Sequence, residues 1–125
     1  MTVDEILVID DDPSVVGLLE EALPWYTTGQ VTTQRDTGVA AQDILSGMRN
    51  PRIIVSDYDN CNASGDKQGG LTLYGLLQKA GKLPAHYIMI SGSPRAELPP
   101  LPEGVEFFSK PLQLQELGKI IEKYD

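Results

Sequence analysis

Acidic side chains follow two short apolar runs of this sequence, at the point where each run stops. Asp10 and Asp11 come directly after the run 5–9, and Asp57 ends the run 52–56. Carboxylates that converge at one place repel one another unless they are compensated, and a hard divalent cation with oxygen ligands is the usual compensation. The three residues therefore predict a magnesium site, and a carboxylate in such a site can itself be the nucleophile that forms an aspartyl-phosphate.

A serine and a lysine stand in comparable places later in the chain. Ser91 and Lys110 each come at or shortly after the end of an apolar run. A lysine supplies fixed positive charge and a hydroxyl donates to a phosphoryl oxygen. Both therefore suit phosphoryl transfer, which depends chiefly on positioning and charge neutralisation. Asp12 has a different predicted role, because the following Pro13 favours a helix start that Asp12 would cap.

Apolar runs of strand length alternate with segments of helical periodicity along the chain. Such alternation implies an α/β fold with a parallel sheet and right-handed crossovers. In sheets of this kind ligands bind beyond the carboxyl ends of the strands, which is where the polar residues above lie. The predicted strands are 5–9, 30–33, 52–56, 86–90 and 105–108, and the predicted helices are 13–23, 38–49, roughly 70–80 and 114–124.

The composition predicts one globular domain over residues 1–125. With 41% hydrophobic and 22% charged residues it is ordinary for a folded protein, and no apolar run approaches the roughly 20 residues that cross a bilayer. A net charge of −8 argues against binding a phosphate backbone, so direct nucleic-acid binding is not expected. The single cysteine, Cys61, excludes an internal disulfide and fits a reducing cytoplasm. We therefore expect a cytoplasmic protein without membrane insertion.

Four sequence motifs resemble those of the receiver domains of two-component response regulators. Asp10 and Asp11 lie within Ile-Leu-Val-Ile-Asp-Asp-Asp-Pro, which is similar to the family's first strand and acidic pair. Ile-Ile-Val-Ser before Asp57 resembles the phosphoacceptor strand, and Ile-Met-Ile before Ser91 resembles the strand that carries the switch hydroxyl. Phe-Phe-Ser before Lys110 resembles the switch aromatic and the family lysine. The resemblance covers nearly the whole chain.

The resemblance implies a flavodoxin-like, doubly wound fold with a five-stranded parallel sheet in the order 2-1-3-4-5. It implies phosphorylation of Asp57 by a histidine kinase or a histidine phosphotransfer protein, with Mg²⁺ as the cofactor. It leaves the downstream effector and a homodimer open. The implied roles are metal binding by Asp10, Asp11, Asp57 and the backbone carbonyl of Asp59, contact with the phosphoryl oxygens by Ser91 and Lys110, switching by Ser91 and Phe107, and a cis Lys110–Pro111 peptide bond.

Two segments depart from the family pattern. The segment 58–69 is longer than usual, polar and turn-prone, and it either covers the site, contacts a partner or is a tolerated surface insertion. Where the family has a fourth crossover helix, four prolines between residues 94 and 102 remove backbone donors and disfavour helical angles before them. That helix is therefore predicted to be missing or shortened to one turn, about residues 94–98.

Two other functions stay open on the sequence. The first is a receiver-like interaction module with little phosphorylation. The second is a phosphohydrolase of the haloacid-dehalogenase type, because Asp57-Tyr58-Asp59 after an apolar strand, followed by Ser91 and Lys110, resembles that family too. Such enzymes place the metal-binding acid pair after the lysine, whereas here the pair comes first. The main prediction is a signalling phosphoacceptor and not an enzyme, except that it catalyses its own phosphorylation and dephosphorylation.

Overall fold

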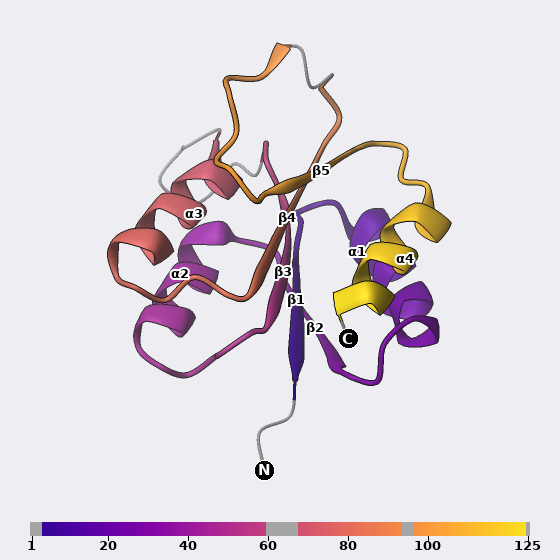
Figure 1. Ribbon diagram of the computed structural model, residues 1–125, viewed down its shortest axis with the longest axis horizontal. Helices are drawn as coiled ribbons and strands as arrows, with labels where there is room; N and C mark the ends of the chain where they lie inside the picture. The colour runs from indigo at the N-terminus through magenta and orange to yellow at the C-terminus, as the bar shows by residue number, and fades with distance from the viewer. Residues whose placement is uncertain (1–3, 60–67, 94–96, 125) are drawn as a thin grey trace.

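The computed structural model describes residues 4–59, 68–93 and 97–124, which form a three-layer α/β sandwich around one parallel sheet (Figure 1). The five strands lie in the order β2-β1-β3-β4-β5, which confirms the predicted flavodoxin-like sheet. The strands are β1 (Glu5–Ile9), β2 (Gln30–Gln34), β3 (Ile53–Asp57), β4 (His86–Ser91) and β5 (Glu106–Ser109). Within the described residues the helices are α1 (Pro13–Ala22), the 3-10 helix η1 (Leu23–Trp25), α2 (Thr37–Leu45), α3 (Gly69–Lys79) and α4 (Leu114–Tyr124).

The helices cover the two faces of the sheet in pairs, α2 with α3 on one side and α1 with α4 on the other (Figure 1). Alternate residues of β1 point to opposite faces. Leu7 and Ile9 pack in the core on the α2–α3 side, and Ile6 and Val8 pack in the core on the α1–α4 side. The central strands are therefore mostly apolar, because both of their faces are buried, and the polar residues Ser56, Asp57 and Ser91 lie at their carboxyl ends. None of the helices in the described residues is long and apolar enough to cross a membrane.

The helix that the prolines were predicted to remove is absent from the described residues between β4 and β5. Residues 97–105 contain no α-helix. Instead Leu98, Leu101 and Val105 pack against the α2–α3 core, so that an irregular segment covers part of the sheet face. The prediction of one turn over residues 94–98 falls partly outside the described residues, as does most of the segment 58–69.

Helix ends follow local capping chemistry. The Asp12 side chain accepts a hydrogen bond from the Ser14 N–H at 2.9 Å, which confirms Asp12 as the N-cap of α1. The prediction that α2 extends to residue 49 is wrong, because the helix ends at Leu45. Gly47 two residues later has a φ of +84°, a left-handed conformation that glycine adopts without steric cost and that terminates helices.

In the layer of α1 and α4, the aromatic ring of Tyr26 packs directly against Gly118. A Cβ added to Gly118 of α4 would lie 2.5 Å from the ring of Tyr26, so only glycine allows this contact.

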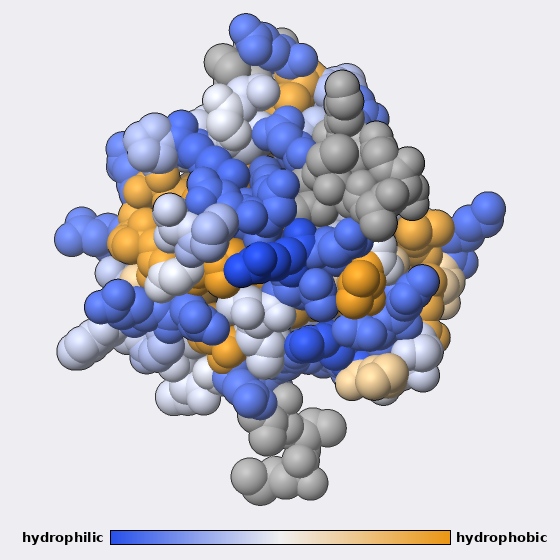
Figure 2. Space-filling view, turned by 180° about the vertical axis from the view of Figure 1, so that it is seen from behind, coloured by the Kyte–Doolittle hydropathy of each residue, from blue (hydrophilic) through white to orange (hydrophobic). Residues whose placement is uncertain are grey.

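The neighbouring Trp25 is 86% exposed. Figure 2 shows the reverse face of the molecule, where hydrophobic side chains gather in separate patches on the left and right with hydrophilic side chains between them.

Candidate functional site

The acidic residues meet at the carboxyl edge of the sheet because their strands are neighbours. β1 and β3 pair in parallel with Ile9 opposite Ser56, so Asp10 and Asp57 follow in register, one residue further along each strand. The Asp10 N–H donates to the carbonyl of Gln34 on β2 at 3.1 Å, which continues the ladder and holds Asp10 in line with its strand. The sheet register alone therefore places the two carboxylates side by side.

Three carboxylates form one cluster. Asp10, Asp11 and Asp57 each place a side-chain oxygen so that these atoms all lie within 4.8 Å of one another. Asp10 is fully buried and Asp57 is 4% exposed, whereas Asp11 is exposed. The cluster therefore has two buried members and one that opens to solvent. The sequence predicted that Asp57 meets Asp10 and Asp11, which lie 47 and 46 positions before it in the chain.

Lys110 supplies the positive charge of the cluster. Its Nζ lies 2.9 Å from Asp10 Oδ2 and 3.5 Å from Asp57 Oδ1. The Lys110 N–H donates to the carbonyl of Ser91 at 2.8 Å, which fixes the start of the β5–α4 connection against the end of β4. The Lys110–Pro111 bond is cis, as the resemblance implied. Among the residues that the structure describes, the ion pairs of the cluster join this one ammonium to two of the three carboxylates, so negative charge is in excess there.

Burial and mutual repulsion change how these groups bind protons. Burial, followed by the charge of Asp10, raises the pKa of Asp57 from 3.8 to about 6. Burial also raises the pKa of Asp10. Burial lowers the pKa of Lys110, but the adjacent carboxylates of Asp10 and Asp57 outweigh this effect, and the net pKa is raised. The lysine is therefore charged near neutral pH and Asp57 is mostly ionised there.

The donor set fits a magnesium ion. All three side chains of the cluster offer carboxylate oxygens, which are the ligands that this cation prefers. Asp10 Oδ2 is buried and, within the described residues, meets the ammonium of Lys110 without a hydrogen bond of good geometry. A buried oxygen with one ionic neighbour and excess negative charge around it leaves coordination capacity for a cation.

Ser91 lies at the site, but its hydroxyl is already engaged. The residue is fully buried at the end of β4, and its Oγ donates to Asp59 Oδ2 at 2.5 Å. The Oγ also accepts a hydrogen bond from the Ser93 N–H at 3.0 Å. Sequence reasoning assigned Asp59 only through its backbone carbonyl and missed this side-chain contact, since the contact depends on how the turn after β3 folds back.

Phe107 lies away from the cluster. It is partly buried and packs against the α2–α3 core, as do Leu101 and Val105 of the irregular segment before it. Its position in β5 opposite Met89 of β4 explains this placement, because alternate residues of a strand point to opposite faces. The described structure therefore brings Asp10, Asp11, Asp57 and Lys110 together and leaves Phe107 in the apolar layer.

Gly70 supports the site and was missed in the sequence. A Cβ at this residue of α3 would lie 2.7 Å from the carbonyl oxygen of Asp57 and 3.0 Å from Tyr58 Cα. The buried Tyr87 hydroxyl donates to the Gly70 carbonyl at 2.7 Å and holds the start of the helix in place. The signal was the pair Gly69-Gly70 before an amphipathic segment, which marks a close backbone approach.

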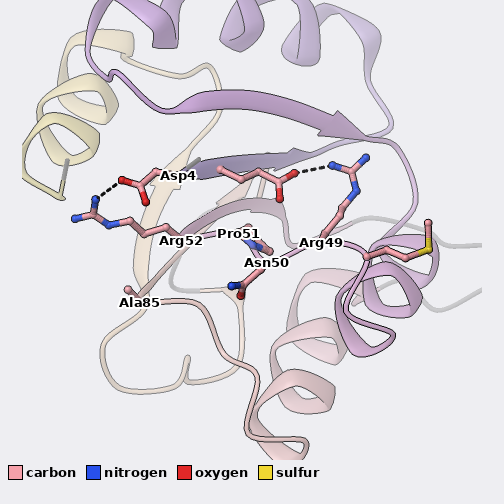
Figure 3. Close-up of a pocket in the computed structure, with 8 residues that line it drawn as sticks. Asp4, Arg49, Asn50, Pro51, Arg52 and Ala85 are labelled. Atoms are coloured by element: carbon pink, nitrogen blue, oxygen red, sulfur yellow. Dashed lines mark hydrogen bonds and ion pairs between the residues drawn. The ribbon is translucent and has the colours of Figure 1, made fainter. Parts of the chain in front are cut away.

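A separate hollow lies at the opposite, amino end of the strands (Figure 3). Its two guanidinium groups already have carboxylate partners: Arg49 Nη1 is 2.7 Å from Glu5 Oε2, and Arg52 Nη1 is 3.1 Å from Asp4 Oδ2. Arg49 Nε also lies 3.3 Å from Asp43 Oδ2. Charges that are paired within the protein offer little to a ligand, so this hollow is a structural feature.

Comparisons with known proteins identify the fold. No protein-family model and no curated protein matches the chain. The signal receiver domain of an HD domain-containing protein from Pseudomonas fluorescens Pf-5 is similar at a TM-score of 0.75 and 21% identity, over 98% of this chain and 94% of that one. The CheY-like receiver domain from Methylobacillus flagellatus has a TM-score of 0.72 and 17% identity, over 99% and 100%.

A third similar structure is the receiver domain of the Francisella response regulator 1452. Its TM-score is 0.75 and its identity 21%, over 97% of this chain and 95% of that one. At such identities the likeness establishes the fold. The chain therefore has the fold of response regulator receiver domains over nearly its whole length, which confirms the fold that the four motifs implied.

Proposed function

We propose that this chain is a phosphoacceptor receiver domain of two-component signal transduction, phosphorylated on Asp57 in a magnesium-dependent reaction. The observation that carries the proposal is the cluster of Asp10, Asp11 and Asp57, with oxygens within 4.8 Å of one another and the Lys110 ammonium 3.5 Å from Asp57. The cluster lies at the carboxyl edge of a sheet with receiver topology, where ligands of such folds bind.

Asp57 has the properties of the nucleophile. It ends β3, and its pKa of about 6 leaves the carboxylate mostly ionised at neutral pH. A carboxylate oxygen would attack the phosphorus of the donor. The new phosphorus–oxygen bond forms as the bond to the donor nitrogen breaks, and the donor imidazole recovers that electron pair. The product is an acyl phosphate on Asp57 and a free histidine on the donor.

The other members of the site would bind and orient the phosphoryl group. A bound magnesium ion would neutralise charge on the phosphoryl oxygens, and Asp10, Asp11, Asp57 and the Asp59 carbonyl would hold it. Lys110 would contact a phosphoryl oxygen from its place beside Asp10 and Asp57, which are 2.9 and 3.5 Å from its Nζ. The Ser91 hydroxyl would donate to another oxygen, and Phe107 would repack as the conformation changes.

The donor would be a histidine kinase or a histidine phosphotransfer protein, which implies action in the cytoplasm. The net charge of −8 supports a protein effector over direct contact with nucleic acid. The irregular segment with Leu98 and Leu101 replaces the helix through which receivers often signal, so the effector surface differs from the usual one.

The test is intact-mass measurement after incubation with magnesium and a small phosphodonor such as acetyl phosphate. We expect the wild-type protein to gain one phosphoryl group and Asp57→Asn to gain none. Lys110→Ala is expected to separate phosphorylation from the conformational change, which amide NMR shifts would report. Equal labelling of wild type and Asp57→Asn would refute the assignment of the phosphoacceptor.

The same samples separate the two other functions. An interaction module would show no adduct under conditions that label a receiver of known activity. A phosphohydrolase would release phosphate from small phosphomonoesters over many turnovers. The chain order of the site, with Asp10 and Asp11 before Asp57 and Lys110 after it, supports the receiver over the hydrolase.

A further inference from the structure

The hydroxyl of Ser91 has a partner that competes with the proposed phosphoryl group. Ser91 Oγ lies 2.5 Å from Asp59 Oδ2, a length typical of a hydroxyl bonded to a charged carboxylate. A serine hydroxyl has one proton to donate. The Ser91 oxygen here also accepts a hydrogen bond from the Ser93 N–H at 3.0 Å. While the proton points at Asp59, Ser91 has none for a phosphoryl oxygen on Asp57.

The contact joins two strand ends that carry the site. Asp59 lies on the turn after β3, where its N–H donates to Asp57 Oδ1 at 3.3 Å, and Ser91 is the last residue of β4. Asp59 therefore contacts the proposed phosphoacceptor through its backbone and the switch hydroxyl through its side chain.

We infer that Asp59 is a positioning residue that withholds the Ser91 hydroxyl from the site, so that phosphorylation of Asp57 must break the Asp59–Ser91 hydrogen bond. This inference rests on the proposed function. The exchange alters no covalent bond, because the proton stays on Ser91 Oγ. The hydroxyl and its side chain rotate, so that the hydroxyl donates to a phosphoryl oxygen in place of Asp59 Oδ2.

The burial of the two partners favours such an exchange. Ser91 is fully buried, so its hydroxyl needs an acceptor inside the protein in either state. Asp59 is exposed, so water can hydrate its carboxylate once the hydroxyl has left. A phosphoryl group on Asp57 also adds negative charge beside Asp59, which makes that carboxylate a less favourable neighbour. Asp59 thus opposes the phosphorylated conformation without preventing it.

The experiment uses beryllium fluoride with saturating magnesium as a phosphoryl mimic, titrated into four proteins and followed by amide NMR signals of Ser91 and Ser93. The proteins are wild type, Asp59→Ala, Ser91→Ala and the double variant. Asp59→Ala should bind the mimic about tenfold more tightly or better, because a hydrogen bond to a charged group is broken only in wild type. In the Ser91→Ala background this gain should shrink to the smaller gain that removal of the Asp59 charge gives by itself.

Asp59→Asn serves as the control for charge. It keeps a side-chain carbonyl that accepts the hydroxyl and removes the negative charge, so its affinity should fall between those of wild type and Asp59→Ala. An equal gain in the presence and absence of the Ser91 hydroxyl would overturn the inference, because simple charge repulsion would explain it. No gain in Asp59→Ala would overturn it as well.

Failure of the proposed function has a different signature. Wild type that binds no mimic at all refutes the phosphoacceptor site and this inference with it. Wild type that binds, with no gain that depends on Ser91, refutes this inference alone. Thermal midpoints of the four proteins without metal or mimic show that each variant is folded. The decreases in thermal midpoint should also be non-additive, so that the decrease in the double variant is smaller than the sum of the decreases in the two single variants.

Discussion

The two ends of the sheet differ in how their charged side chains are compensated. At the amino end Arg49 lies 2.7 Å from Glu5 and Arg52 lies 3.1 Å from Asp4, so each guanidinium has a carboxylate partner. At the carboxyl end, within the described residues, three carboxylates cluster beside the Lys110 ammonium, and burial keeps water from screening Asp10 and Asp57. Paired charges at a rim stabilise the fold a little, whereas a buried excess of one sign costs stability.

This difference indicates which end is functional. A protein retains a costly cluster when a ligand or a reaction compensates it, and perturbed pKa values gather at such sites. Asp57, with its pKa raised to about 6, belongs to the costly end. Removing charge should therefore have opposite effects at the two ends. Of the four predictions below, the first tests the packing of the carboxyl end and the other three test the contrast in charge.

The largest effect is expected from Gly70→Ala at the carboxyl end. The new Cβ would lie 2.7 Å from the Asp57 carbonyl oxygen, and backbone cannot rotate aside as a side chain can. We expect a loss of about 3 kcal/mol in the free energy of unfolding and weaker magnesium binding, since overpacking displaces α3 from the site. Gly75→Ala is the matched control in the same helix, because its Cβ meets nothing within 4 Å. Chemical denaturation of both variants checks this.

The second prediction concerns pH in the presence of a chelator. The pKa of Asp57 is about 6 in the folded protein against 3.8 for the ordinary group, so the folded state binds the proton more tightly. The resulting stability is fully present below the unfolded pKa and is lost as pH rises through about 6. Wild type should lose about 2 kcal/mol more than Asp57→Asn between pH 4 and pH 7.5.

His86 acts in the opposite direction, because burial lowers its pKa, and stability is lost as pH falls. Both proteins contain this histidine, so the difference between their denaturation curves isolates Asp57. A flat difference across this pH range would mean that burial and the charge of Asp10 do not raise the pKa of Asp57.

Magnesium should stabilise wild type by about 1.4 kcal/mol at a concentration ten times its dissociation constant, as mass action requires of a ligand of the folded state. Asp57→Asn and Asp10→Asn should each reduce this gain, because each removes a charged ligand from the cluster. Thermal melts with magnesium chloride are compared with melts in sodium chloride of equal ionic strength. An equal response to both salts would argue against a specific site.

The smallest effect is expected at the amino end. Arg49→Gln removes a guanidinium that pairs with Glu5 at 2.7 Å and Asp43 at 3.3 Å, so we expect a loss of about 1 kcal/mol that shrinks at high salt. The exposed Lys119→Gln controls for loss of a positive charge. Stabilisation by Arg49→Gln would abolish the contrast between the two ends.

Several parts of the structure could be predicted from the sequence because they depend on residues close together in the chain. The apolar runs predicted the strands within a residue or so, and Asp12-Pro13 predicted the start of α1, since capping depends on adjacent residues. The prolines predicted the loss of a helix before β5. Helix α2 was predicted four residues too long, because Gly47 outweighed the apolar periodicity.

The contacts between segments that are distant in the chain could not be predicted from local patterns. The Asp59–Ser91 hydrogen bond joins residues 32 positions apart through a turn whose path no short pattern specifies. Gly70 on the Asp57 backbone and Tyr26 on Gly118 likewise depend on how closely two elements approach. Such distances are set by packing of the whole core, to which every element contributes.

The sequence by itself determined the order of strands and helices, the acids and lysine at strand ends and the place where a helix is missing, since periodicity, capping and proline act over a few residues. The sequence also predicted that Asp10, Asp11 and Asp57 meet. Only the tertiary structure decided that their oxygens lie within 4.8 Å of one another, that two of the three side chains are buried, and that Asp59 holds the Ser91 hydroxyl. The reason is that burial and charge compensation are properties of groups brought together by folding.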